Sequence, residues 1–162
     1  MLTKFLPLFL ALFLLPNSSL ADDGKSLTGN WKIVSYQMEF QSTGEKLEPR
    51  GKNPGGFINF TSEGWMGVVI TDEGRKPATT DQDRADLFKT MVAYMGPYQV
   101  EGDKWITKVE VAHNPAWVGT TQTRTFKIEG TRLQEITQFM PYPPQPEKGM
   151  VRYIITYEKS KN

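Results

Sequence analysis

The fold is decided by residues 105–128, which read WITKVEVAHNPAWVGTTQTRTFKI. Two segments rich in β-branched residues alternate apolar and polar side chains on either side of a short connection at residues 114–119. Alternation with a period of two is typical of half-buried strands. The pattern predicts an antiparallel hairpin, which carries the only histidine and two of the four tryptophans. We therefore expect part of any ligand site to lie in this hairpin.

Two polar residues of the hairpin are candidates for that site. Arg124 alternates in phase with Phe126 and Ile128, so its guanidinium is predicted to point into the interior. An inward arginine needs a partner, because an unpaired buried charge is very costly. A carboxylate of the protein and an anionic or carbonyl group of a ligand fit this need equally well. His113 ends the first strand, where a structural or rim position is favoured over a catalytic role.

The first 21 residues are predicted to be a cleaved signal peptide. Lys4 precedes an apolar run, a polar break follows, and small residues occupy both positions that a signal peptidase inspects before Asp22. An uncleaved anchor is the less favoured alternative, because the run is shorter than the roughly 20 residues that a spanning helix needs. The absence of cysteine excludes a lipoprotein and a disulfide scaffold. We expect an exported protein, periplasmic or secreted, with no membrane insertion after cleavage.

Residues 22–162 are predicted to form a single domain. Without the signal peptide, 18 basic residues balance 18 acidic ones. Neither nucleic acid nor an anionic membrane is an expected partner, since both require a clustered positive excess. A domain of this size can build one hydrophobic core without a metal or disulfides. The oligomeric state is not indicated by the sequence.

Further alternating segments predict a mainly β fold. The expected strands are residues 29–40, 56–60, 65–71, 98–101, 104–113, 120–128, 132–139 and 150–158. About eight antiparallel strands joined by short turns favour a closed, or nearly closed, up-and-down β-barrel, which also removes exposed edges. A half-open sheet curled around a helix is the alternative.

One α-helix is predicted in the middle of the chain, over residues 79–95. Apolar residues recur there at three- and four-residue steps: Leu87, Phe88, Met91, Val92 and Met95. Thr80 or Asp81 is suited to cap its start, and Gly96-Pro97 to end it. Such a stripe favours packing of the helix against the core over a functional role.

Two loops are expected to border a ligand site. Residues 41–56 are polar and rich in glycine and proline, and a loop of this length in a small domain is a candidate lid. Residues 140–149 contain four prolines, which disfavour a paired strand and favour a stiff loop at the rim.

The sequence excludes several kinds of chemistry. One histidine and no cysteine rule out zinc sites built from several nitrogen or sulfur ligands. No dinucleotide-binding, phosphate-loop, haem-attachment or serine-nucleophile motif occurs, so we assign no cofactor and no catalytic residue. Carboxylate chemistry stays open, because Glu110, Glu135 and Glu158 lie on predicted strands. Glu110 and Glu158 are expected to face water, whereas the direction of Glu135 is undecided.

Several motifs resemble the lipocalin-like domain family, whose members are exported and mostly have no characterised activity. Residues 29–36 resemble the opening Gly-x-Trp motif of calycins, and residues 56–66 the second hairpin of this family. The likeness continues in order at residues 93–98, 109–119, 124 and 129–133, and covers essentially all of residues 22–162. It implies a calycin-type barrel able to hold a small apolar molecule. Relatives often carry a histidine where this chain has Thr107-Lys108, so any role of that histidine does not transfer.

The leading functional hypothesis is an exported protein that binds a small hydrophobic or amphipathic molecule. Pockets of that kind combine apolar walls with few polar anchors. Trp31 is expected in the core, and the candidate ligand-binding residues are Arg124, Trp117, His113, Trp65, Tyr36, Tyr153 and Glu135. One alternative is a cofactor-free isomerase or cyclase acting on a small carbonyl or polyketide-like compound through His113, Arg124 or Glu135. Another is an envelope interaction module that uses an exposed apolar surface and no ligand.

Overall fold

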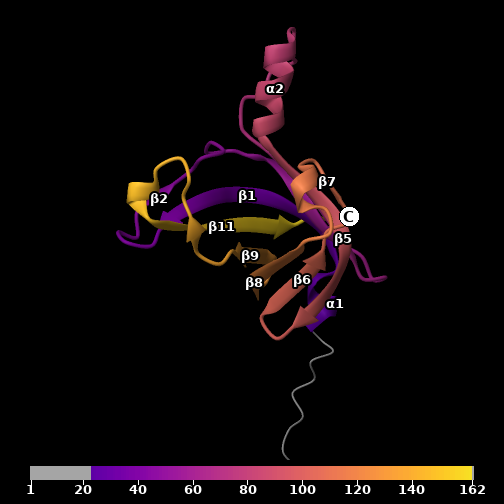
Figure 1. Ribbon diagram of the computed structural model, residues 1–162. Helices are drawn as coiled ribbons and strands as arrows, with labels where there is room; N and C mark the ends of the chain where they lie inside the picture. The colour runs from indigo at the N-terminus through magenta and orange to yellow at the C-terminus, as the bar shows by residue number, and fades with distance from the viewer. Residues whose placement is uncertain (1–22, 162) are drawn as a thin grey trace, which may run out of the picture.

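The computed structural model describes residues 23–161, which form a closed antiparallel β-barrel (Figure 1). Eight strands follow one another around it in chain order, and pairing of the first with the last closes it. They are β1 (Gly29–Phe40), β3 (Gly55–Phe60), β4 (Trp65–Thr71), β5 (Met91–Glu101), β6 (Lys104–Lys108), β8 (Thr121–Glu129), β9 (Arg132–Ile136) and β11 (Met150–Lys159). The predicted closed barrel is confirmed. The predicted signal peptide lies outside the described residues.

Short elements decorate the barrel. Three extra strands of two residues each are β2 (Lys46–Leu47), β7 (Val111–Ala112) and β10 (Met140–Pro141). The helices are α1 (Asp23–Leu27), α2 (Asp81–Lys89) and the single-turn 3-10 segments η1 (Pro115–Trp117) and η2 (Pro146–Lys148). Within residues 23–161, no helix has the length and apolar character needed to cross a membrane.

Halfway along β1, the buried side chains switch from odd-numbered to even-numbered residues. Its pairing with β11 shifts between Ile33 and Ser35, which leaves Val34 as the extra residue of a β-bulge. The side chains buried before and after the bulge are Trp31 and Ile33, then Tyr36, Met38 and Phe40. The sequence leaves the orientation of this strand open because both faces carry apolar residues, and the bulge explains why both do.

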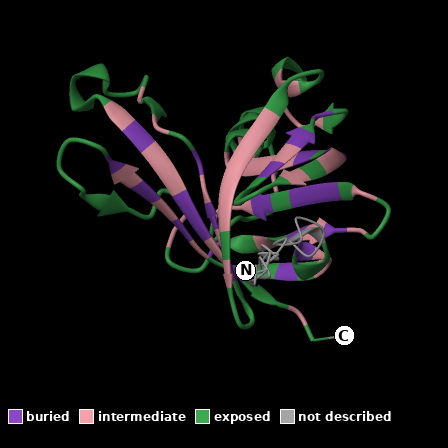
Figure 2. Ribbon diagram, turned by 90° about the horizontal axis from the view of Figure 1, so that it is seen from below, coloured by how far each residue is buried: buried purple, intermediate pink, exposed green. Residues whose placement is uncertain are grey.

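One end of the barrel is filled by large apolar side chains. The ring of Phe60 lies edge-on to Tyr98 and Trp105, with centroids 5.0 Å and 5.2 Å apart. Helix α1 lies against β5, and the carbonyl of its buried Leu27 accepts a hydrogen bond of 2.7 Å from Trp31 Nε1. Trp31 is fully buried, as predicted. Figure 2 shows buried residues interspersed with intermediate and exposed ones along the strands of the barrel.

Helix α2 differs from the prediction in its length and in its packing. It stands away from the barrel and buries none of its residues, so the expectation that it covers the core is wrong (Figure 1). Its start agrees with the prediction: Thr80 Oγ1 accepts from the Asp83 amide, and the Asp83 carboxylate accepts from the Thr80 amide. Met91, Val92 and Met95 belong to β5 instead, which also runs through Gly96-Pro97. Apolar residues on both faces of β5 imitate the spacing of a helix.

The hairpin at the centre of the chain is confirmed, with a shorter first strand. β6 pairs with β8, and Trp105 lies opposite Arg124. The strand ends at Lys108, whose carbonyl passes so close to Gly96 that a Cβ there would lie 1.9 Å from its oxygen. The chain then turns, and β7 pairs with β5 rather than with β8.

The proline-rich segment forms a rim loop, with one difference from the prediction. Met140 and Pro141 pair with Val151 and Met150 as the short strand β10. β10 lies at the edge of the sheet and has a neighbouring strand on one side only. Pro141 has no amide hydrogen, and on the open side of β10 there is no strand that needs one.

Candidate functional site

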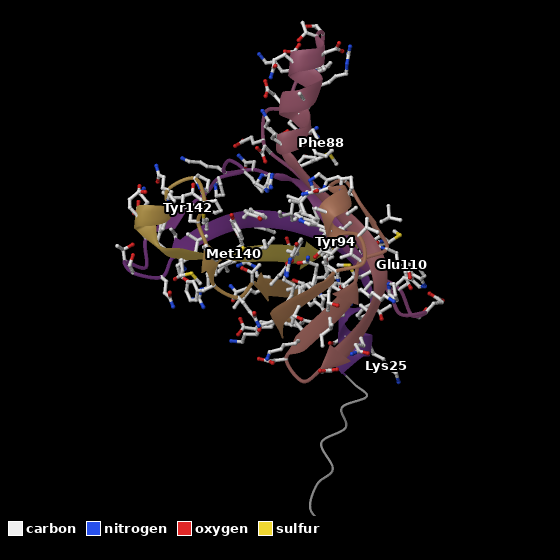
Figure 3. All side chains as sticks on the ribbon, in the orientation of Figure 1. Lys25, Phe88, Tyr94, Glu110, Met140 and Tyr142 are labelled. Atoms are coloured by element: carbon white, nitrogen blue, oxygen red, sulfur yellow. The ribbon has the colours of Figure 1, made fainter. Side chains whose placement is uncertain are left out.

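A cavity of about 390 Å³ lies inside the barrel, beyond the filled end. Its volume falls at the small end of the range of small-molecule pockets. Its walls are aromatic and aliphatic, with a few polar groups among them. The lining residues are Tyr36, Arg50, Val68, Ile70, Val92, Tyr94, Trp117, Gln122, Arg124, Glu135, Thr137, Met140, Tyr153, Ile155 and Tyr157. Figure 3 shows Tyr94 of β5 within the barrel, far from Lys25 at the opposite end of the molecule.

The polar wall of the cavity is organised around Glu135, which is buried. Arg124 donates from Nε to Glu135 Oε1 at 3.0 Å, and the Tyr157 hydroxyl donates to Glu135 Oε2 at 2.8 Å. The other nitrogens of Arg124 donate to the carbonyl of Thr123 and to Oε1 of Gln122, both at 3.0 Å. Arg124 therefore points inward as predicted, and its partner is a carboxylate of the protein.

The electrostatics of this wall keep Arg124 charged and the tyrosines protonated. Burial opposes the charge on Arg124, but Tyr94 and Glu135 outweigh burial and raise its pKa. Burial, followed by the nearby Glu135, raises the pKa of Tyr157 well above its usual value. Burial also raises the pKa of Tyr36 to about 12, although Arg50 acts in the opposite direction. The tyrosine hydroxyls are thus hydrogen-bond donors at neutral pH.

A second arginine enters the cavity from the loop between β2 and β3. Arg50 forms an ion pair with Asp72, which directly follows β4, and its guanidinium lies 4.9 Å above the ring of Tyr36. The loop that carries it is held by Glu73, whose carboxylate accepts hydrogen bonds from Lys52 and Asn53. The predicted loop at residues 41–56 therefore borders the site and is tied to the end of β4.

Five of the seven predicted ligand-binding residues line this cavity together: Arg124, Trp117, Tyr36, Tyr153 and Glu135. Trp65 does not, because Met66, Val68 and Ile70 of β4 face inward and leave Trp65 on the outer face, 40% exposed.

His113 also lies outside the cavity. Its Nδ1 is 3.2 Å from both the amide nitrogen and the carbonyl oxygen of Ala93. Its ring lies between Phe88 of α2 and Trp117 of η1, with centroids 5.1 Å and 5.0 Å away. Figure 3 places Phe88 at the end of α2 that joins the barrel. His113 thus connects the base of the helix to a tryptophan of the cavity wall.

Sequence reasoning missed five polar residues of the site, which are Arg50, Tyr94, Gln122, Thr137 and Tyr157, and three of them show different reasons. Arg50 lies in an irregular loop, where no periodicity indicates its direction. Tyr94 falls within the segment predicted as a helix. Tyr157 shares the predicted face of Tyr153 and Ile155, so strand periodicity was a usable signal for it.

The outer face of the barrel carries exposed apolar side chains on neighbouring strands. Phe57 pairs opposite Val69, and both are about half exposed, at 50% and 51%. Met95 and Val111, which face each other on β5 and β7, are also exposed. Glu110 and Glu158 face water, as predicted. An interaction module of the kind considered above would use this apolar face.

Comparison with solved structures finds similar barrels at low sequence identity. A lipocalin-like protein from Bacteroides uniformis is 14% identical, with a TM-score of 0.43, over 83% of this chain and 98% of that chain. An uncharacterized protein from Bacteroides eggerthii is 12% identical, with a TM-score of 0.41, over 83% of this chain and 99% of that chain. A mutant of the fluorescent protein UnaG is 15% identical, with a TM-score of 0.38, over 85% of this chain and 99% of that chain. No curated protein sequence matches the chain. The sequence model of the lipocalin-like domain matches residues 28–160, and the chain therefore belongs to the lipocalin-like domain family.

Proposed function

We propose that this protein is exported and binds a small amphipathic molecule inside its barrel. The observation that carries the proposal is the cavity of about 390 Å³, in which aromatic and aliphatic walls surround Arg50, Arg124 and several tyrosine hydroxyls. Binding pockets for small molecules have this composition, with an apolar lining and few polar groups that fix orientation. Export rests on the predicted signal peptide at residues 1–21.

Native mass spectrometry of the protein purified from its own compartment tests the proposal. We expect a bound small molecule in the wild type, and quenching of Trp117 fluorescence when an amphipathic probe enters the cavity. A matched pair of variants separates cavity binding from surface binding. Val92→Trp fills the cavity, whereas Val69→Trp adds the same bulk to the outer face of the neighbouring strand.

The expected result is loss of the bound molecule in Val92→Trp and its retention in Val69→Trp. Equal binding by the two variants would place the ligand elsewhere. Circular dichroism of both variants controls for loss of the fold, because extra bulk in a packed interior is itself destabilising.

An isomerase or cyclase is the second candidate, favoured by the buried carboxylate of Glu135 beside the Tyr157 hydroxyl and the Arg124 guanidinium. Such a group of proton carriers can stabilise an enolate in a closed pocket. Glu135→Gln keeps the shape of the side chain and removes its charge. An enzyme would lose turnover of its substrate in this variant, whereas a binding protein shows no turnover in either form.

A further inference from the structure

The two arginines of the cavity differ in how much of their hydrogen-bonding capacity is used. Arg124 donates to a carboxylate, a backbone carbonyl and a side-chain amide. Arg50 donates from Nη1 to Asp72, and its Nε is buried without a hydrogen-bond partner among the described residues. A buried donor without a partner is costly, and every such group calls for an explanation. Among the described residues that line the cavity, the fully buried donor without a partner therefore belongs to Arg50.

Arg50 is also held in a fixed position before any ligand arrives. The Glu73 amide donates to the carbonyl of Arg50 at 2.9 Å, and the Glu73 carboxylate accepts from Asn53 at 2.8 Å. Gly51 makes this possible, because its φ of +83° is unfavourable for other residues and an added Cβ would lie 2.6 Å from the Glu73 carboxylate. Asp72 on one side and Tyr36 below hold the guanidinium in place at the wall of the cavity.

A guanidinium with an unused donor has a definite chemical preference. Nε and Nη2 of an arginine lie side by side on one edge of the planar group, and a carboxylate can accept from both in parallel. A neutral hydroxyl or carbonyl oxygen takes a single, weaker hydrogen bond. Apolar and aromatic side chains, including Val92 and Trp117, line the same cavity and suit the body of an amphipathic molecule.

We propose that the ligand carries a carboxylate or a similar planar oxyanion, which binds the guanidinium of Arg50, while Arg124 and Glu135 form the fixed wall. This inference rests on the proposed binding function and names the head group of its ligand. Tyr36, below the guanidinium, keeps its proton because burial raises its pKa, and its hydroxyl is a second donor close to the anion.

Two fluorescence-quenching probes of the same size test the proposal: 2-naphthoate, which carries the carboxylate, and 2-naphthylmethanol, which carries a neutral hydroxyl on the same ring. We expect the wild type to bind naphthoate about 10-fold or more tightly than the alcohol, because charge-assisted bonds are about twice as strong as neutral ones. Arg50→Gln should remove that preference. Arg50→Lys keeps the charge and loses the two-donor edge, and should retain only a fraction of the preference. The matched control is Arg132→Gln, since Arg132 is an exposed arginine on β9.

A variant that is expected to bind naphthoate more tightly is a control for unfolding, because an unfolded protein would bind it less tightly. Asp72→Asn removes the carboxylate that competes for Arg50, so naphthoate should bind several-fold more tightly while the alcohol is unaffected. Retention of the carboxylate preference in Arg50→Gln, or equal binding of the two probes by the wild type, would overturn the inference and leave cavity binding intact. Failure of the wild type to bind either probe would overturn both this inference and the proposed function for ligands of this size.

Discussion

At the scale of single residues, Glu135 is the side chain on which the interior of the barrel depends. It accepts hydrogen bonds on both oxygens, from Arg124 and from Tyr157, in a wall that also contains Thr137. Removing one partner of a buried ion pair costs more than replacing both, because the charge that remains is left without compensation.

Arg124→Met should lower the free energy of unfolding by about 3 kcal/mol, since it leaves Glu135 buried and unpaired. The double variant Arg124→Met with Glu135→Gln should recover part of that loss, because no uncompensated charge remains. Urea denaturation of the three proteins measures the differences. A double variant less stable than the single one would contradict this account of the wall.

Tyr36 links the stability of the barrel to alkaline pH. Its pKa is about 12 in the folded protein and 10.0 in the absence of the fold, so the unfolded chain releases the proton first. Stability is therefore complete below pH 10 and falls as the pH rises towards 12, by about 3 kcal/mol for two pKa units.

Tyr36→Phe should accordingly flatten the loss of thermal stability between pH 10 and 12 relative to the wild type. Melting temperatures at several alkaline pH values, together with tyrosinate absorbance, provide the measurement. Identical slopes in the two proteins would show that Tyr36 titrates alike in the folded and unfolded states.

The two arginines mark the limit of what single residues reveal in a sequence. Arg124 was predictable because it shares the parity of Phe126 and Ile128, and strand periodicity fixes the face of each residue. Whether its partner was Glu135 or a ligand depended on cross-strand register, which periodicity does not supply. Arg50 gave no signal at all, since its direction follows from long-range contacts with Asp72 and Glu73.

At the scale of elements, the excursion that contains α2 is separable from the barrel. Thr71 and Met91 are directly paired, and the Asp72 amide donates to the carbonyl of Thr90 at 3.0 Å. Everything between Glu73 and Lys89 therefore leaves the sheet and returns to the same place. Phe88 of this excursion contacts the ring of His113 and is still 49% exposed.

Replacing residues 74–88 by Asn-Gly should change the free energy of unfolding by no more than about 1 kcal/mol, because a shorter loop offsets part of the lost Phe88 contact. Asp72 and Glu73 remain, so the loop that carries Arg50 keeps its anchors. Thermal denaturation and naphthoate binding measure both consequences. A loss of stability above about 3 kcal/mol would mean that the excursion packs on the barrel in solution.

Strand boundaries were predictable where turn residues flank the strand, as for β1 and β4, whose ranges match the prediction. The helix was overextended into β5, because a barrel strand with apolar residues on both faces imitates helical spacing. The outward Met95 meets Val111 of β7, and this neighbour was invisible in the sequence. Tertiary pairing thus decided the conformation of residues that local pattern left ambiguous.

At the scale of the whole molecule, the barrel is divided into a packed end and a hollow end. The packed end, with Trp31 and Trp105, supplies stability, and the hollow end is free to carry a site. The closed barrel followed from the number and spacing of strands, whereas the existence of the cavity did not, because volume depends on how side chains of different strands meet.

Export is a property of the entire chain and has a direct test. The protein expressed with its first 21 residues should be recovered from the periplasm or medium with a mass that corresponds to a start at Asp22. Replacing Ala21 by a bulky residue such as Phe should block cleavage, because the peptidase requires small residues there. Recovery of full-length protein from the cytoplasm would contradict the prediction.

The bulge at Val34 divides β1 into two segments whose inward-facing residues have opposite parity. Odd-numbered residues before the bulge face the packed end, and even-numbered residues after it face the hollow end. Substitution of Val34 is therefore tolerable, whereas deletion of Gln37, where the strand has no extra residue, would turn Met38 and Phe40 outward together. Because the bulge separates the two segments, substitutions can change the lining of the cavity while the packing of the filled end stays the same.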